Sequence, residues 1–157
     1  MKQLYTDNKA VSTSVGFILT FVITIITFIL VMQSSYGLMD QAEHTVMREE
    51  FEIHGNNIAL QLTKIDTMVG IVNNGGGEIV EHRSELMVPI KIANEYYYVE
   101  FSNQTREIIF ESNERSETRV QVAFDIENTN IMSTTLSSAS GDHFLLYNST
   151  SNVIEIY

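Results

Sequence analysis

The sequence predicts an α+β fold, in which a long N-terminal helix, transmembrane at first and extended beyond the membrane, precedes a small antiparallel β-sheet domain. Three observations indicate this fold. The 30 residues between Lys9 and Asp40 carry no charge, hydrophobic residues then recur every three or four positions as far as Val72, and the hydrophobic period changes to two after the glycines at 75–77. A period near 3.6 is typical of a helix with one buried face, and a period of two is typical of strands.

The uncharged stretch is long enough to cross a membrane. Its central part, Val15–Met32, has eighteen residues and is interrupted only by one glycine and three threonines. A helix rises about 1.5 Å per residue, so about 20 apolar residues span the hydrocarbon core. The apolar part of a secretory signal is shorter, about 7–15 residues, although the small residues Ser34, Ser35 and Gly37 keep signal cleavage as an alternative. We expect a transmembrane helix over residues 11–39, in contact with membrane lipid.

The charges around the stretch predict its orientation and exclude one class of partner. Lys2, Lys9 and the amino terminus precede it against a single Asp7. Basic residues stay on the cytoplasmic side, so we expect a single-pass protein of the cell membrane with a cytoplasmic N-terminus and an extracellular C-terminal domain. From Asp40 onward there are nineteen acidic and seven basic residues, a net charge of −12. Nucleic-acid binding needs a basic surface, so no nucleic-acid partner is expected.

A second helical segment is predicted over residues 40–72, outside the membrane. Its hydrophobic residues lie on one face of the helix, because they recur every three or four positions. They are Met47, Phe51, His54, Ile58, Leu62, Ile65, Val69 and Val72. Residues 73–77, Asn-Asn-Gly-Gly-Gly, are expected to end the helix and to act as a hinge. We expect this stripe to pack against one face of the sheet.

Residues 78–157 are predicted to form an antiparallel β-domain. Hydrophobic residues alternate in four runs, and a hairpin is expected at the end of the chain. The runs are Leu86–Ile92, Tyr97–Phe101, Ile108–Phe110 and Val120–Phe124, and the hairpin strands are Phe144–Tyr147 and Val153–Tyr157. Turns are expected at 102–105, 112–116 and 148–152. Pro89 cannot donate a hydrogen bond to a neighbouring strand, so its strand is predicted to be an edge or to be bulged.

The beginning of the chain resembles a known processing site. The sequence Lys-Ala-Val-Ser-Thr-Ser-Val-Gly-Phe-Ile-Leu at 9–19 is similar to the processing region of archaeal type IV pilins and pilin-like proteins. The resemblance implies that residues 1–10 are a class III-type leader, which a prepilin peptidase removes by cutting between Ala10 and Val11. A long helix followed by a β-domain also resembles the pilin-like layout. Many archaeal pilins have a proline where this chain has Thr13, a departure that weakens assignment to a major adhesive pilin. Bacterial pilins usually have a glutamate where it has Val15.

Small and hydroxyl residues line one face of the predicted span. Thr13, Gly16, Thr20, Thr24 and Thr27 follow one another at spacings of three or four. Such a face allows helices to approach closely in lipid, so we expect packing with copies of the chain or with other pilin-like subunits. The alternative is that each threonine hydroxyl bonds to a carbonyl of its own helix.

No other motif indicates chemistry. His44, His54, His82 and His143 have no metal-ligand spacing, and no nucleophile motif is visible, so we expect no enzyme, no metal and no cofactor. Asn103 and Asn148 begin N-glycosylation acceptor sequences in predicted turns.

Together with the predicted span and β-domain, the resemblance implies a membrane-anchored structural subunit of an archaeal surface filament or pseudopilus, processed by a prepilin peptidase. The alternative is an unprocessed single-pass protein whose extracellular β-domain is a binding or sensing module.

Overall fold

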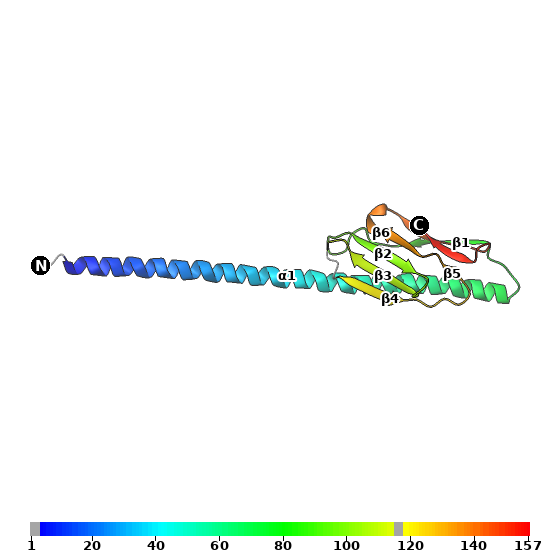
Figure 1. The fold of residues 1–157 in the computed structure, drawn as a ribbon, viewed down its shortest axis with the longest axis horizontal. Helices are drawn as coiled ribbons and strands as arrows, with labels where there is room; N and C mark the ends of the chain where they lie inside the picture. The colour runs from blue at the N-terminus through cyan, green and yellow to red at the C-terminus, as the bar shows by residue number, and fades with distance from the viewer. Residues whose placement is uncertain (1–3, 115–117) are drawn as a thin grey trace. The chain divides into compact units, whose positions relative to one another are not determined.

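The computed structural model describes residues 4–114 and 118–157, with side chains from residue 12 onward. The chain divides into two compact units, Met1–Ala42 and Glu43–Tyr157. One helix, α1, runs over Leu4–Asn74 and belongs to both units. Within the described part of the second unit, eight strands and one short 3-10 helix follow α1 (Figure 1). The predicted α+β fold, a long N-terminal helix followed by mostly antiparallel strands, is confirmed.

In the second unit, α1 buries the face that the hydrophobic period predicts. Six residues of the stripe are at most 3% exposed: Met47, Phe51, Ile58, Leu62, Ile65 and Val69. His54 and Val72 are half-buried. Each large hydrophobic side chain removed from water stabilises the fold by roughly 1.5–3 kcal/mol. The stripe therefore attaches the helix firmly to the strands.

The helix ends two residues later than predicted, at Asn74, in a glycine-dependent cap. The Gly77 N–H donates to the Val72 carbonyl at 2.9 Å and the Gly76 N–H donates to the Asn73 carbonyl at 3.1 Å. This pair of bonds is a Schellman motif, which needs a left-handed residue at the first of its two donors. Gly76 supplies it with φ of +77°. Whether the segment also acts as a hinge stays a prediction.

The strands form two four-stranded sheets, whereas a single sheet was predicted from the sequence. The first has the order β4 (Arg119–Ala123), β3 (Glu107–Ser112), β2 (Tyr97–Ser102), β6 (Thr134–Ser137), and the second has the order β1 (Glu81–Leu86), β7 (His143–Asn148), β8 (Val153–Ile156), β5 (Asn130–Ile131). Neighbouring strands are antiparallel except β5 and β8, which are parallel. The 3-10 helix η1 (Ser138–Ser140) follows β6 where the chain changes sheet. One core contains residues of α1 and of both sheets.

The strand expected over Leu86–Ile92 is wrong. The observed strand, β1, ends at Leu86, where the predicted one begins. The Val88 N–H donates to the Leu86 carbonyl at 3.0 Å, which turns the chain, and Pro89 has no N–H for a neighbouring strand. β1 itself has no hydrophobic alternation, because it is an edge strand in which only Leu86 is buried.

The other predicted strands are confirmed. Tyr97, Val99 and Phe101 on β2 are fully buried, while Tyr96 and Tyr98 are exposed on either side of Tyr97. β7 and β8 pair as the predicted hairpin, and the turn expected at 102–105 follows β2. Residues 115 and 116 of the turn expected at 112–116 lie outside the described residues.

Candidate functional site

The first unit presents the apolar span of α1. An 18-residue window of this helix has a mean hydropathy of 2.8, and none of that window is buried. Large side chains are exposed along it, for example Phe17 at 75% and Leu38 at 66%. A helix that is apolar on all sides belongs in lipid or in a helix bundle rather than in water. Among the described residues, α1 is the one helix that is long and apolar enough to cross a membrane.

The threonines of the predicted packing face bond to their own helix. The hydroxyl of Thr20 donates to the Gly16 carbonyl at 2.9 Å, that of Thr24 to the Thr20 carbonyl at 2.8 Å, and that of Thr27 to the Ile23 carbonyl at 2.8 Å. These are the bonds that we expected if the threonine hydroxyls bond to carbonyls of their own helix and not to a neighbouring helix. A hydroxyl keeps its acceptor capacity when it donates, so the face remains able to accept a bond from a neighbouring helix. Packing through this face, which includes Thr13, stays a prediction.

A second apolar stripe on α1, which was not predicted from the sequence, lies in the second unit. Val46, Ile53, Leu60 and Ile71 are 49%, 54%, 68% and 67% exposed. At 100° per residue, Ile53 stands about 140° around the helix from buried Ile58, so this outer stripe points away from the strands. All four residues follow Asp40, the residue that ends the uncharged span. The sequence does carry a signal for this stripe, because Val46, Ile53 and Leu60 lie seven residues apart. The signal is weak, because only one apolar residue falls in every two turns of the helix.

Opposite the outer stripe, Asp66 fastens α1 to the loop before β5. Its Oδ1 accepts bonds from the backbone N–H of Asn128 at 2.8 Å, the backbone N–H of Thr129 at 2.7 Å and the Thr129 hydroxyl at 2.8 Å. Its Oδ2 accepts from the Glu127 N–H at 3.1 Å and from Asn128 Nδ2 at 3.0 Å. Asp66 is 4% exposed. Burial raises the pKa of Asp66, but these hydrogen bonds to the charged form outweigh burial and hold the pKa below its ordinary value.

The loop also approaches the helix backbone at Gly70, one turn after Asp66. A Cβ built on Gly70 would lie 2.6 Å from Asn128 Nδ2, the atom that donates to Asp66. A glycine four residues after the aspartate therefore leaves the room that the Asn128 amide needs. Thr63 adds a third contact on this side of the helix, because its hydroxyl donates to the Asp125 carbonyl at 3.1 Å.

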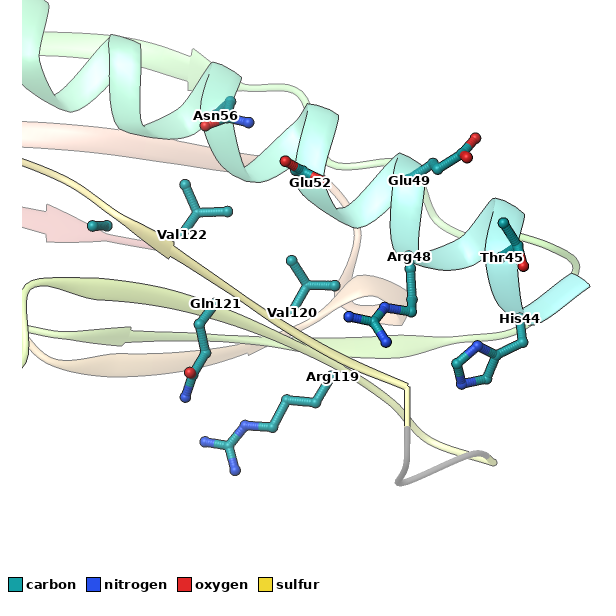
Figure 2. A pocket seen from close by; sticks show the side chains of 11 residues that line it. His44, Thr45, Arg48, Glu49, Glu52, Asn56, Arg119, Val120, Gln121 and Val122 are labelled. Carbon is teal, nitrogen blue, oxygen red and sulfur yellow. The ribbon is translucent and has the colours of Figure 1, made fainter.

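A groove of about 1070 Å³ runs between α1 and β4 (Figure 2). Val120 and Val122 point from β4 toward the helix, and Gly55 makes room for Val122, since a Cβ there would lie 2.6 Å from Val122 Cγ2. Arg48 lies close to the beginning of β4, near Arg119 (Figure 2). Arg48, Arg119 and His44 line this end of the groove, together with Glu49 and, one turn further along α1, Glu52.

The structure places the remaining predicted residues apart from one another. Asn103 is exposed in the turn after β2, whereas Asn148 is half-buried and its Oδ1 accepts a bond from the Thr150 N–H at 2.9 Å. Ala10 and Val11 are helical, but their side chains lie outside the described residues.

Both ring nitrogens of His143 lie 3.2 Å from backbone carbonyls, Nδ1 from that of Tyr157 and Nε2 from that of Ser137. This contact joins the segment after β8 to β6 and has a structural role. Across the part of the chain that the structure describes, no group of three or more His, Cys, Asp or Glu residues could hold a metal.

The chain can also be compared with known proteins. No curated protein and no solved structure matches it. One family profile matches residues 6–156, and thus covers the span, the rest of α1 from residue 6 onward and the strands β1 to β8 of the second unit. The chain therefore belongs to DUF7266, a family of unknown function.

Proposed function

We propose that the protein is a membrane-anchored structural subunit of an archaeal surface filament or pseudopilus, and that a prepilin peptidase processes it between Ala10 and Val11. The observation that supports this most is the outer stripe of α1, Val46, Ile53, Leu60 and Ile71, which is exposed although it follows the span. Apolar residues that recur on one exposed face of a helix are typical of a face that packs against another helix.

The direction of the stripe favours assembly through the helix. It points away from the strands, so copies that meet through it place their helices together and their β-domains outside. Burial would stabilise such a contact by roughly 1.5–3 kcal/mol for each Val, Ile or Leu. The span is apolar on all sides, and in lipid or in a helix bundle it would continue the same association.

The alternative is an unprocessed single-pass protein whose extracellular β-domain binds a ligand or senses one. The groove between α1 and β4 is the observation that favours it, because ligand sites are concave. Its lining is largely charged and polar, however, and the groove gives no role to the outer stripe of α1.

Sequencing the N-terminus of the native protein separates these two functions. A mature chain that begins at Val11 supports the processed subunit, whereas an intact Met1 supports the permanent anchor. Replacing Ala10 with tryptophan should block cleavage by a peptidase that requires a small residue. A matched Asn8→Trp variant, two residues earlier in the leader, should still be processed.

A further inference from the structure

Four of the described strands of the second unit lie at sheet ends: β4 and β6 in one sheet, β1 and β5 in the other. β4 and β1 are the longest of the four, with five and six residues, and they offer the longest open edges. On β4, the Thr118 carbonyl accepts a bond from the Ser112 N–H, and the Phe124 N–H donates to the Arg106 carbonyl. Because bonding direction alternates along an antiparallel strand, the backbone groups of every second residue from Thr118 to Phe124 point to β3. Those of Arg119, Gln121 and Ala123 then point outward, into the groove beside α1.

The same reasoning applies to β1. Phe144 exchanges backbone bonds with Tyr157, on the side of β8. Because bonding direction alternates along β7, the next residue, Leu145, and every second residue after it direct their backbone groups to β1. The backbone groups of Glu81, Arg83 and Glu85 therefore point outward, and all three residues are exposed. Among the described residues, no backbone bond reaches either outward set.

The two edges flank α1 on opposite sides. The groove beside β4 is lined by Arg48, and a second recess, which includes Glu85 at the end of β1, is lined by His54. Arg48 precedes buried Phe51 by three residues and His54 follows it by three. At 100° per residue, each stands about 60° from Phe51, one on either side.

The edges also run in opposite directions along the helix. β4 begins near Arg48 and ends near Asn56, so it follows the direction of α1 (Figure 2). β1 begins after the C-terminal end of α1 and ends beside His54, so it runs against that direction. A second copy, rotated about an axis along the helix, therefore brings its β1 antiparallel to β4 of the first. All copies then have their helices pointing in the same direction, as subunits anchored in one membrane must.

The charges of the two edges are complementary. Arg48 and Arg119 line the β4 groove, and neither forms an ion pair with any residue that the structure describes. Glu49 and Glu52 also line it, but Glu49 points away from β4 (Figure 2). β1 carries Glu81, Arg83 and Glu85 on its outward positions, so the acidic residues outnumber the basic one there.

We infer that the β4 edge pairs head to tail with the β1 edge of a second copy, which joins the β-domains of neighbouring subunits laterally. The inference rests on the proposed function, since it supplies the contact between subunits that meet through their helices. In an antiparallel register, Arg119 lies opposite Glu85, Gln121 opposite Arg83 and Ala123 opposite Glu81, and all six direct backbone groups toward the partner strand. Opposite charges in direct register stabilise a strand pair, whereas like charges destabilise it.

Cross-linking of full-length chains in membranes tests this contact, because the natural sequence has no cysteine. One chain carries Gln121→Cys, and a second chain of different length carries Arg83→Cys. Facing Cα atoms of such a pair are about 5.5 Å apart, within the range of a disulfide. Oxidation should give a mixed dimer when both chains are produced together. A Glu100→Cys chain, with its cysteine exposed on β2 between two paired neighbours, replaces the Gln121→Cys chain as the control and should give none.

Charge reversals then test the register. Arg119→Glu in the first chain, or Glu85→Arg in the second, should lower the yield of mixed dimer about two- to fivefold, the effect of one exposed ion pair. Both changes together restore opposite charges and should restore the yield. An equal loss with the Glu100→Arg control would contradict the register.

Two results overturn the inference and leave the proposed function intact. One is the absence of the mixed dimer in membranes where Leu60→Cys chains, which report contact through the outer stripe, do cross-link. The other is a dimer of Gln121→Cys chains alone, which indicates a two-fold contact between β4 edges. If neither the Leu60→Cys chains nor the mixed pair cross-links, the proposed function fails together with the inference.

Discussion

Replacing Asp66 with asparagine should destabilise the second unit by about 2–3 kcal/mol. The carboxylate is 4% exposed and accepts five hydrogen bonds from residues 127–129. Asparagine has the same shape and keeps one acceptor oxygen. Its amide group, however, turns a donor toward the Glu127 N–H and the Asn128 side chain, so two donors lose their acceptor.

The magnitude follows from those two losses and from the missing charge. A hydrogen bond to a charged group contributes about 1.5–3 kcal/mol, and partial hydration of the loop recovers part of the loss. Asp66→Ala removes both oxygens and leaves three backbone N–H groups without their acceptor, so about 3–4 kcal/mol is expected. Asp125→Asn is the control, because its side chain is 80% exposed and lies 3.3 Å from Arg106 in a surface ion pair, which makes a change within about 0.5 kcal/mol expected.

Urea unfolding of the full chain in detergent measures these differences. The chain has seven tyrosines and no tryptophan, and Tyr97 is fully buried in the second unit. Near-ultraviolet circular dichroism therefore follows the loss of tertiary packing around the tyrosines rather than the helicity of the span. The reasoning is refuted if Asp66→Asn unfolds within 0.5 kcal/mol of the natural protein, or if Asp125→Asn is as destabilised as Asp66→Asn.

Three further predictions concern the same unit. The folded pKa of Asp66 lies below the unfolded value of about 3.9. The stability that Asp66 contributes is therefore present above pH 4 and is lost as the pH falls through the folded pKa. The free energy of unfolding should fall between pH 5 and 2, and Asp66→Asn should diminish this fall. Tyr97→Phe removes the hydroxyl that donates to the Pro89 carbonyl, which should cost about 1 kcal/mol in urea unfolding and speed hydrogen exchange in residues 87–93. Gly55→Ala places a Cβ 2.6 Å from Val122 Cγ2, so overpacking of about 1–3 kcal/mol should exceed the gain of up to about 1 kcal/mol in helix propensity; a rise in the urea midpoint would contradict this.

The sequence predicts those parts of the fold that a local period determines. The buried stripe of α1 is evident because each of its residues is large and recurs at helical spacing. The alternation of β2 is evident for the same reason, since Tyr97, Val99 and Phe101 are all buried on one side. Both patterns can be recognised from neighbouring residues alone.

Contacts between distant segments have no such local signal. β1 lacks alternation because it is a polar edge strand, and its place is set by β7, which lies about 60 residues later. The bonds of Asp66 reach 61–63 residues along the chain, so neither the aspartate nor its loop indicates the other. The outer stripe of α1 was missed because polar residues separate its members, and their shared exposure becomes evident only when the strands are seen to cover the other face.

Cysteine scanning along residues 43–63 of the native, membrane-held protein tests the central claim most directly. The claim is that the outer stripe of α1 is the surface through which copies of the chain associate. Cross-linking between copies should then peak at Val46, Ile53 and Leu60, seven residues apart, and should be low at Glu52 and at Thr63, which lie to the side of that line. Cross-linking that shows no period, or none at all in intact membranes, would contradict the account.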